Sequence, residues 1–339
     1  MAATPPHPAV SSHTYTIAGV LVTVHGLAEL PPSVAAAACL WLLHPRLQAR
    51  ETMAPIAAQV ISAWNARVHS GTAGRHPNGL VAVAFDQRNH GSRCVDPLHN
   101  EAWRQGNPRH VQDMFSCYHG TATDTSLLID HLESYVFNTP ASPKITHHLA
   151  LGISLGGHAT WHCLLSDPRI TAGVVAIGCP DYTRLMTDRA RLSKRTTYTD
   201  TTPPGASFLG SPDFPPALRD AVAQYDPAGL LLPAHFNPVG ADSPPSLDRF
   251  KLLVRERLHG KKILNLSGKA DKLVPYAAGE PFYKILKHVL SRDESLQIGF
   301  DDVLFDGVGH AFPQSMADKA TEWICEVLVG EERDVTSKI

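Results

Sequence analysis

Short apolar runs alternate along the chain with segments whose apolar residues follow helical spacing. The runs at residues 35–44 and 80–85 are apolar on both faces, which is typical of strands covered by helices on either side. Further strands are predicted within residues 14–27, as a hairpin, and at 145–153, 173–178, 261–266 and 300–305. Helical spacing predicts helices at residues 46–69, 111–137, 155–165, 277–290 and 314–329. Strands that alternate with helices indicate an α/β protein with a doubly wound, mostly parallel sheet.

The pattern changes between residues 180 and 259, which are rich in Pro, Thr and Ser and contain only short apolar bursts. This segment is too long for an ordinary connection, so we expect an inserted cap with its own helices at about residues 182–195, 217–224 and 247–258. The core is therefore expected to comprise residues 14–179 and 260–330. Residues 1–13, rich in Pro, Ala and Ser, are expected to be a flexible N-terminal segment.

The composition and charge of the chain argue against some classes of binding partner. Of the 339 residues, 18% are charged and the net charge is −2, with Lys and Arg scattered along the chain. No basic face for nucleic acid or an anionic membrane is predicted. The longest apolar run, residues 34–43, is about half of the ~20 residues that a membrane helix needs.

The spacing of the cysteines and the N-terminal residues indicate in which cellular compartment the protein is expected. The six cysteines are widely spread and form no CxxC pair, which favours reduced thiols over a disulfide framework or a metal site. The first eight residues lack the basic and apolar regions of a secretion signal. We therefore expect a cytoplasmic protein, and the sequence carries no signal for an oligomeric state.

The clearest candidate for chemistry is the segment Gly152-Ile153-Ser154-Leu155-Gly156, between a predicted strand and a predicted helix. A serine on so sharp a turn takes strained backbone angles, and glycines two residues away on either side remove the resulting collisions. Ser154 is therefore a candidate nucleophile. The Leu155 N–H, at the helix N-terminus, is a candidate donor to an oxyanion.

A general base and an acid are expected downstream of the serine, at the ends of later strands. His310 lies in Asp306-Gly-Val-Gly-His310, directly after the last predicted strand, where glycines let the backbone bring the ring toward Ser154. Asp271 follows the strand at residues 261–266 and is the favoured acid to orient His310. Asp181, after the strand at residues 173–178, is the alternative acid.

Together these segments resemble the α/β-hydrolase superfamily, in its serine esterase and prolyl-oligopeptidase-like branch. The resemblance rests on the Ser154 elbow, on Asp271 before Leu-Val-Pro and on Gly-x-Gly-His310. It also rests on residues 86–92, which are similar to the family's Asp-x-Arg-x-His-Gly-x-Ser loop. It covers most of residues 20–329 except the cap and implies an intact Ser-Asp-His triad that works without a metal or an organic cofactor. Within residues 86–92, Arg88 and His90 are interpreted as organising the loop.

One segment departs from the family pattern. Where these hydrolases commonly carry His-Gly after their third strand, this chain has Leu43-His44-Pro45-Arg46. Pro45 has no N–H to donate, so by analogy the Arg46 amide is expected to complete the oxyanion hole. His25-Gly26 is an alternative match. The Arg46 side chain is a candidate contact for an acidic substrate group, with a surface ion pair as the alternative.

These features favour a carboxylesterase-like serine hydrolase acting on a small-molecule ester through an acyl-enzyme on Ser154. A peptidase or a thioester or lactone hydrolase of the same fold is the alternative. From another class, the chain could be a catalytically inactive binding protein. The predicted cap supplies apolar residues that would form either a substrate pocket or the cap's own core: Phe208, Phe214, Tyr225, residues 230–232 and Phe236.

Overall fold

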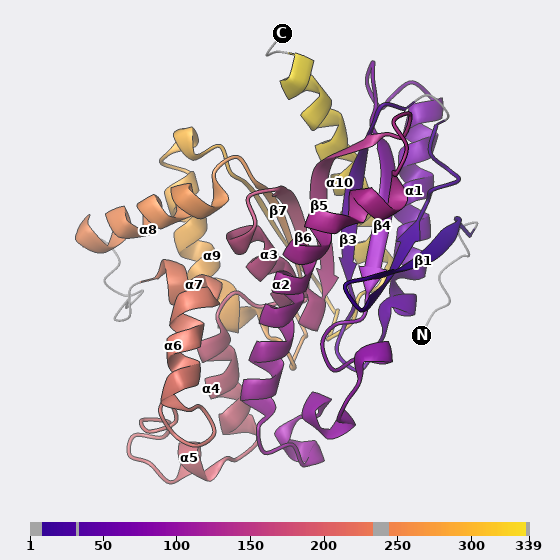
Figure 1. Cartoon of the computed structure of the whole chain (residues 1–339). Coiled ribbons are helices and arrows are strands. Elements are labelled where there is room, and N and C mark those ends of the chain that lie inside the picture. The colour runs from indigo at the N-terminus through magenta and orange to yellow at the C-terminus, as the bar shows by residue number, and fades with distance from the viewer. Residues whose placement is uncertain (1–8, 32–33, 233–243, 337–339) are drawn as a thin grey trace.

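The computed structural model describes residues 9–31, 34–232 and 244–336 (Figure 1). Eight strands form one sheet in the order β1-β2-β4-β3-β5-β6-β7-β8. The first two strands form an antiparallel hairpin, β2 pairs antiparallel with β4, and all other pairings are parallel. The strands are β1 (Ser12–Ile17), β2 (Val20–His25), β3 (Ala36–Leu43), β4 (Gly79–Phe85), β5 (Lys144–Ile153), β6 (Ile170–Ala176), β7 (Lys262–Gly268) and β8 (Gly299–Phe305).

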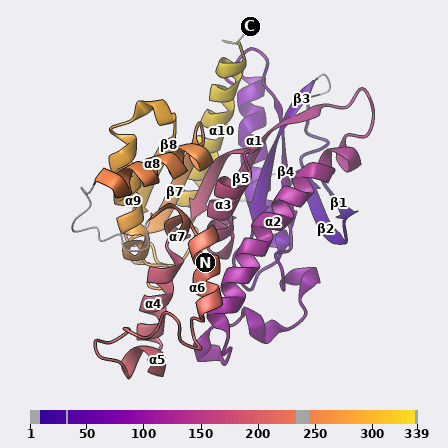
Figure 2. The ribbon, with the colours of Figure 1, turned by 60° about the vertical axis from the view of Figure 1, so that its left-hand side comes forward.

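Helices cover both faces of this sheet, as Figures 1 and 2 show from two directions. One face packs against α1 (Ala54–His69) and α10 (Gln314–Thr336). The other packs against α2 (His110–Val136), α3 (Leu155–Ser166) and α9 (Tyr276–Leu290). The prediction of a doubly wound, mostly parallel sheet is confirmed.

Alternation along the strands explains the two cores. In β3, Cys39, Trp41 and Leu43 point to the face that carries α2 and α3, whereas Leu40 and Leu42 point to the face that carries α1 and α10. All five side chains are buried. Because successive side chains of a strand point to opposite faces, a central strand covered on both sides must be apolar throughout. This is the pattern from which the strand was predicted.

The inserted segment between β6 and β7 contains α4 (Tyr182–Leu192), α5 (Thr196–Thr199), α6 (Pro216–Tyr225), α7 (Pro227–Leu231) and α8 (Pro244–Leu258). It packs on the face that carries α2, α3 and α9. Phe208 and Phe214 are fully buried and their rings are in edge contact. Phe208 also packs against Trp103, so these two residues belong to a core that the segment shares with the rest of the fold. Phe236, for which a substrate pocket and the cap's own core were the alternatives, lies outside the described residues.

At the N-terminus, strand β1 begins at Ser12, and residues 1–8 of the segment expected to be loose lie outside the described residues. The described part of the chain contains no helix long and apolar enough to cross a membrane. All six cysteines are unpaired, and Cys94 is the one that is exposed.

Candidate active site

Ser154 lies at the junction of β5 and α3 in a conformation that is rare for a residue with a side chain, φ 55° and ψ −109°. Such a conformation costs on the order of 1–3 kcal/mol and persists only where the surroundings fix it. Here the Ser154 N–H donates to the Ala176 carbonyl at 2.9 Å, and the His158 N–H donates to the Ser154 carbonyl at 3.0 Å. The turn leaves Ser154 half-buried, whereas its neighbours from residue 151 to 160 are buried.

The two glycines of the elbow are required by close approach of backbone to backbone. A Cβ atom on Gly152 would collide with the backbone of Gly156, and a Cβ on Gly156 would collide with the Leu43 carbonyl. The start of α3 therefore lies directly against the end of β3. This contact brings the loop after β3 beside the serine.

His310 reaches Ser154 from the loop after β8. That loop turns at Gly307, whose φ of 71° is in the left-handed region. The His310 Nε2 atom lies 2.8 Å from Ser154 Oγ, and the imidazole remains 22% exposed. This distance allows a proton to pass directly from hydroxyl to ring.

Asp271 holds the other side of the His310 ring. Its Oδ2 atom lies 2.7 Å from His310 Nδ1, and its side chain is fully buried. Its Oδ1 atom accepts from the Leu273 N–H at 2.8 Å and the Val274 N–H at 2.9 Å, which fixes the carboxyl group. Because a carboxylate only accepts, the Nδ1 atom carries the proton and Nε2 is free to accept from Ser154.

The loops that carry Asp271 and His310 are also bonded to each other. The Ala270 N–H donates to the Val308 carbonyl at 2.9 Å, and the Lys269 N–H donates to the Phe305 carbonyl at 2.9 Å. A Cβ on Gly268 would meet the Val308 carbonyl, so this crossing requires glycine. The pairing fixes the acid relative to the histidine.

Asp181, the alternative acid, has a different role in the structure. It accepts from the Arg184 N–H at 2.9 Å at the start of α4 and pairs with the Arg184 side chain at 3.3 Å. Burial raises the pKa of Asp181. The structure brings Asp271, and not Asp181, to the imidazole of His310.

Two backbone N–H groups are free to act as oxyanion donors. The amides of Leu155 and Arg46 have no acceptor within residues 9–31, 34–232 and 244–336. Both residues line the same small cavity of about 10 Å³. In the alternative segment, the Gly26 N–H donates to the Ser11 carbonyl at 2.9 Å and is therefore not available.

The loop that carries Arg46 is fixed by His44 and Gln87, neither of which was assigned this role from the sequence. His44 Nδ1–H donates to the Pro45 carbonyl at 2.8 Å, and His44 Nε2 accepts from the Gln87 N–H at 3.0 Å. The Gln87 side chain donates in turn to the His44 carbonyl. Burial lowers the pKa of His44 to about 4, so its ring stays neutral and keeps both bonds. The sequence held one indication of this role, because Gln87 lies inside the loop at residues 86–92 that was expected beside the active site.

The same loop is tied to the helices beside it. Asp86 accepts from the Arg50 side chain and from the Ser92 N–H at 2.9 Å, and Arg88 pairs with Asp124 on α2 at 2.9 Å. These contacts agree with the interpretation of Arg88 as an organising residue. The His90 ring lines the small cavity beside Leu155.

Next to Arg46 the surface opens into a cleft of about 340 Å³. Its walls come from the loop after β3, the turn at residues 102–105, helix α4 and the loop that follows Asp271. The lining residues are Arg46, Ala102, Arg104, Gln105, Leu185, Asp188, Arg189, Leu192, Ser193, Lys272, Leu273 and Pro275.

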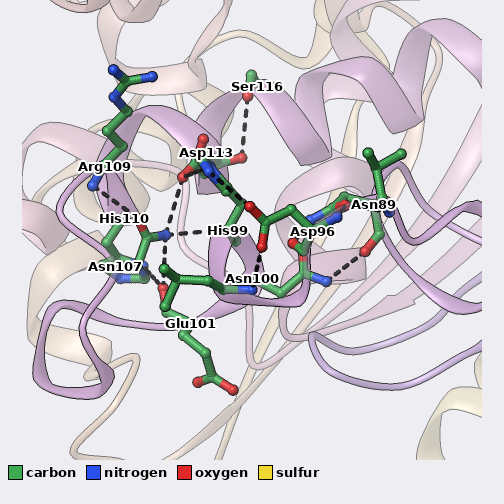
Figure 3. Close-up of polar contacts among 12 residues, drawn as sticks. Asn89, Asp96, His99, Asn100, Glu101, Asn107, Arg109, His110, Asp113 and Ser116 are labelled. Carbon is green, nitrogen blue, oxygen red and sulfur yellow. Dashed lines mark hydrogen bonds and ion pairs between the residues drawn. The ribbon is translucent and has the colours of Figure 1, made fainter.

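The rim of this cleft at residues 100–105 is held by the polar cluster of Figure 3. The Asn107 side-chain amide donates to the carbonyls of His99, at 3.3 Å, and Glu101, at 3.1 Å, and to Asp113 at 3.0 Å. The His110 Nδ1–H also donates to the Glu101 carbonyl, at 3.0 Å. One rim of the cleft is thereby fixed to the start of α2.

In the described ranges no group of three or more His, Cys, Asp or Glu side chains is placed to hold a metal ion. No protein-family model matches the sequence, and no curated protein matches it either.

Solved structures resemble the chain over nearly its whole length. Protein TT1662 of Thermus thermophilus matches with a TM-score of 0.55 at 18% identity, covering 94% of this chain and 98% of that one. A Bacteroides ovatus protein provisionally assigned as a dipeptidyl aminopeptidase IV matches with a TM-score of 0.52 at 11% identity, covering 95% of this chain and 36% of that one. The esterase Pf2001 of Pyrococcus furiosus, at 14% identity over 94% of this chain and 92% of that one, has a TM-score of 0.48. At such identities the likeness concerns the fold.

Proposed function

This chain has the α/β-hydrolase fold, and on that premise we propose that it is a serine hydrolase that cleaves carboxylic esters of small molecules. One observation carries the proposal. Ser154 Oγ, the two ring nitrogens of His310 and the carboxyl of Asp271 form an unbroken hydrogen-bonded chain, with links of 2.8 and 2.7 Å. Three residues far apart in sequence are hydrogen-bonded in the order that acyl transfer requires, with the His310 ring in the tautomer that can accept the serine proton.

In the first step Ser154 Oγ attacks the ester carbonyl while its proton passes to His310 Nε2. The imidazolium that forms is stabilised by Asp271, which keeps accepting from Nδ1. The carbonyl oxygen becomes an oxyanion, and the N–H groups of Leu155 and Arg46 are the proposed donors to it. His310 then gives its proton to the departing alkoxide, and the acyl group remains on Ser154.

In the second step His310 removes a proton from water, which attacks the acyl-enzyme. The tetrahedral intermediate uses the same two N–H donors. Its collapse returns the proton to Ser154 and releases the carboxylic acid. The proposed oxyanion donors are backbone groups held by the Gly156–Leu43 contact and by the His44–Gln87 bonds, so they need no rearrangement during the reaction.

The test is labelling by a fluorophosphonate probe followed by substrate profiling. We expect the chain to label, and Ser154→Ala to abolish labelling without loss of folded circular dichroism. Hydrolysis of 4-nitrophenyl esters of graded chain length should exceed that of aminoacyl-nitroanilides. The reverse preference would make the chain a peptidase, and a folded chain that neither labels nor turns over either series would be an inactive binding protein.

A further inference from the structure

The cleft beside Arg46 carries an excess of positive charge. Four cationic side chains line it, namely Arg46, Arg104, Arg189 and Lys272. The single carboxylate in its lining, Asp188, is already paired with Arg191 at 2.6 Å. The charge of the lining is therefore not balanced from within the cleft.

Within the part of the chain that the structure describes, the three guanidinium groups donate only to neutral acceptors. Arg46 donates to the Asn100 carbonyl, and Arg104 donates to the Leu192 carbonyl. Arg189 donates to the Leu273 carbonyl at 2.9 Å and to His110 Nε2 at 3.0 Å.

None of the four cations forms an ion pair with another residue of the described ranges. Other half-buried arginines of the fold do form ion pairs: Arg50 pairs with Asp86, and Arg195 pairs with Asp213 at 2.7 Å. The cleft differs from these two sites in that several cations gather there without such a partner.

Burial of these charges has a free-energy cost that the fold offsets only in part. Burial lowers the pKa of Arg46 by more than Glu101 raises it. Burial, with a smaller contribution from the nearby Arg46, lowers the pKa of Arg189 to about 10, although Asp271 raises it. The pKa of His110 is lowered to about 3, first by burial and then by Arg189 and Arg46, so its ring is neutral and can accept from Arg189. Half-buried cations that form no ion pair are expected where a ligand supplies the counter-charge.

The unpaired cations border the candidate catalytic groups. Arg189 donates to the carbonyl of Leu273, and the N–H of Leu273 donates to Asp271. Arg46 lines both this cleft and the small cavity that Leu155 also lines. Neither Ser154 nor His310 is among the residues that line the cleft or the small cavity, so Arg46 and Leu273 connect the cations to the candidate triad.

We propose that the substrate is an anionic ester, whose acyl or alcohol part carries a carboxylate or phosphate that the guanidinium groups of Arg46, Arg104 and Arg189 bind. This inference rests on the proposed ester hydrolysis and names its substrate class. Guanidinium groups suit both anions because their planar donors match the oxygens of either.

The test compares two substrates that differ in one charge. These are the mono-4-nitrophenyl ester of glutaric acid and the same compound with its free carboxyl capped as a methyl ester, both followed by nitrophenolate release. We expect kcat/KM to be at least about tenfold higher for the anionic ester. The preference should shrink as salt rises from 0.05 to 1 M, because salt screens exposed charges. Glutarate and inorganic phosphate are then compared as inhibitors of hydrolysis of the capped substrate, and the stronger inhibitor shows whether the site prefers a carboxylate or a phosphate.

Variants locate the effect. Arg104→Gln and Arg189→Gln should each lower the ratio of the two kcat/KM values by about fivefold or more, mainly through KM, whereas Arg189→Lys should retain part of the preference. Arg219→Gln, an exposed arginine on α6, is the matched control and should leave the ratio unchanged. If Arg189→Gln fails to fold, the exposed Arg104 still provides the test.

Different results would refute the anionic substrate and the hydrolase activity. Equal kcat/KM for both substrates in a chain whose Ser154 labels with fluorophosphonate would overturn the anionic substrate and leave the hydrolase standing. A ratio unchanged in both Arg104→Gln and Arg189→Gln would also overturn it. No turnover together with no labelling would refute the hydrolase itself.

Discussion

Replacing Asp271 by asparagine tests the central geometry with a change of one atom. The Oδ1 atom of Asp271 accepts from two N–H groups, those of Leu273 and Val274, while Oδ2 accepts from His310 Nδ1 at 2.7 Å. An asparagine that keeps its oxygen on the two N–H groups must point its NH₂ at His310. The opposite orientation would set NH₂ against two donors, at about 1–3 kcal/mol for each bond left unmade.

This orientation of the asparagine changes which ring nitrogen of His310 carries the proton. A donor facing Nδ1 requires that nitrogen to be unprotonated, so the proton moves to Nε2, which faces Ser154 Oγ at 2.8 Å. The ring can then no longer accept the serine proton. The same inversion in serine proteases lowers kcat by about 10⁴, which corresponds to roughly 5 kcal/mol in the barrier. We expect a loss of this order in Asp271→Asn, with little change in KM.

The assay is steady-state hydrolysis of a 4-nitrophenyl ester, with circular dichroism to show that the variant is folded. Asp181→Asn is the matched control, because asparagine also caps a helix and Asp181 contacts Arg184, not His310. Its activity should stay within about twofold of the parent, since no reacting group is touched. Near-full activity in Asp271→Asn, or a collapse of activity in Asp181→Asn, would refute the assignment of the acid.

Three further predictions concern stability. Gly156→Ala should lower the free energy of unfolding by about 3 kcal/mol or more, because its Cβ would meet the Leu43 carbonyl; Gly299→Ala, whose Cβ meets only ordinary contacts, should not, as chemical denaturation of both would show. Between pH 7.5 and 5, urea titrations should show a loss of about 2 kcal/mol for each of His110 and His158, whose pKa burial lowers to about 3. The sign follows because the unfolded ring, with a pKa of 6.5, takes up a proton that the folded ring refuses, so stability is full above pH 6.5 and lost as the pH falls; a flat profile would contradict it. Asp213→Ala should lower the melting temperature and cost about 2 kcal/mol, since Asp213 is buried and accepts from Arg195 at 2.7 and 3.0 Å; an unchanged melting temperature would show that this pair contributes nothing.

The sequence predicted the sheet because each central strand is apolar on both faces, and β3 and β4 lie where those runs predicted them. It also located the candidate triad, because Ser154, Asp271 and His310 each follow a strand directly and carry local backbone signals. The glycines beside Ser154 and before His310 can be recognised in the sequence. They are required there by close backbone contacts at the elbow and by the positive φ of Gly307 in the loop.

Features that depend on side chains from distant segments were beyond the sequence. Arg46, Arg104, Arg189 and Lys272 come from four separate stretches, and no spacing links them until the fold brings them to one cleft. Phe208 was ambiguous for a related reason. Apolar residues of an inserted segment look the same whether they line a pocket or form a core, and only packing shows that this one is buried.

The candidate catalytic groups and the cleft cations are held by the fold in different ways, and this difference bears on how the protein can change. Around Ser154 backbone lies against backbone, so a single methyl group on Gly156 is excluded. Arg104 is exposed and is held by one bond to a carbonyl, so it can be replaced with little effect on packing. Substitutions of the exposed cations, which change the preference for substrate charge, should therefore be tolerated, whereas substitutions at the elbow should not. A library that varies residues 104 and 272, both exposed, should yield mostly folded chains whose activity differs in preference for charge, while one that varies residues 152 and 156 should yield mostly unfolded ones.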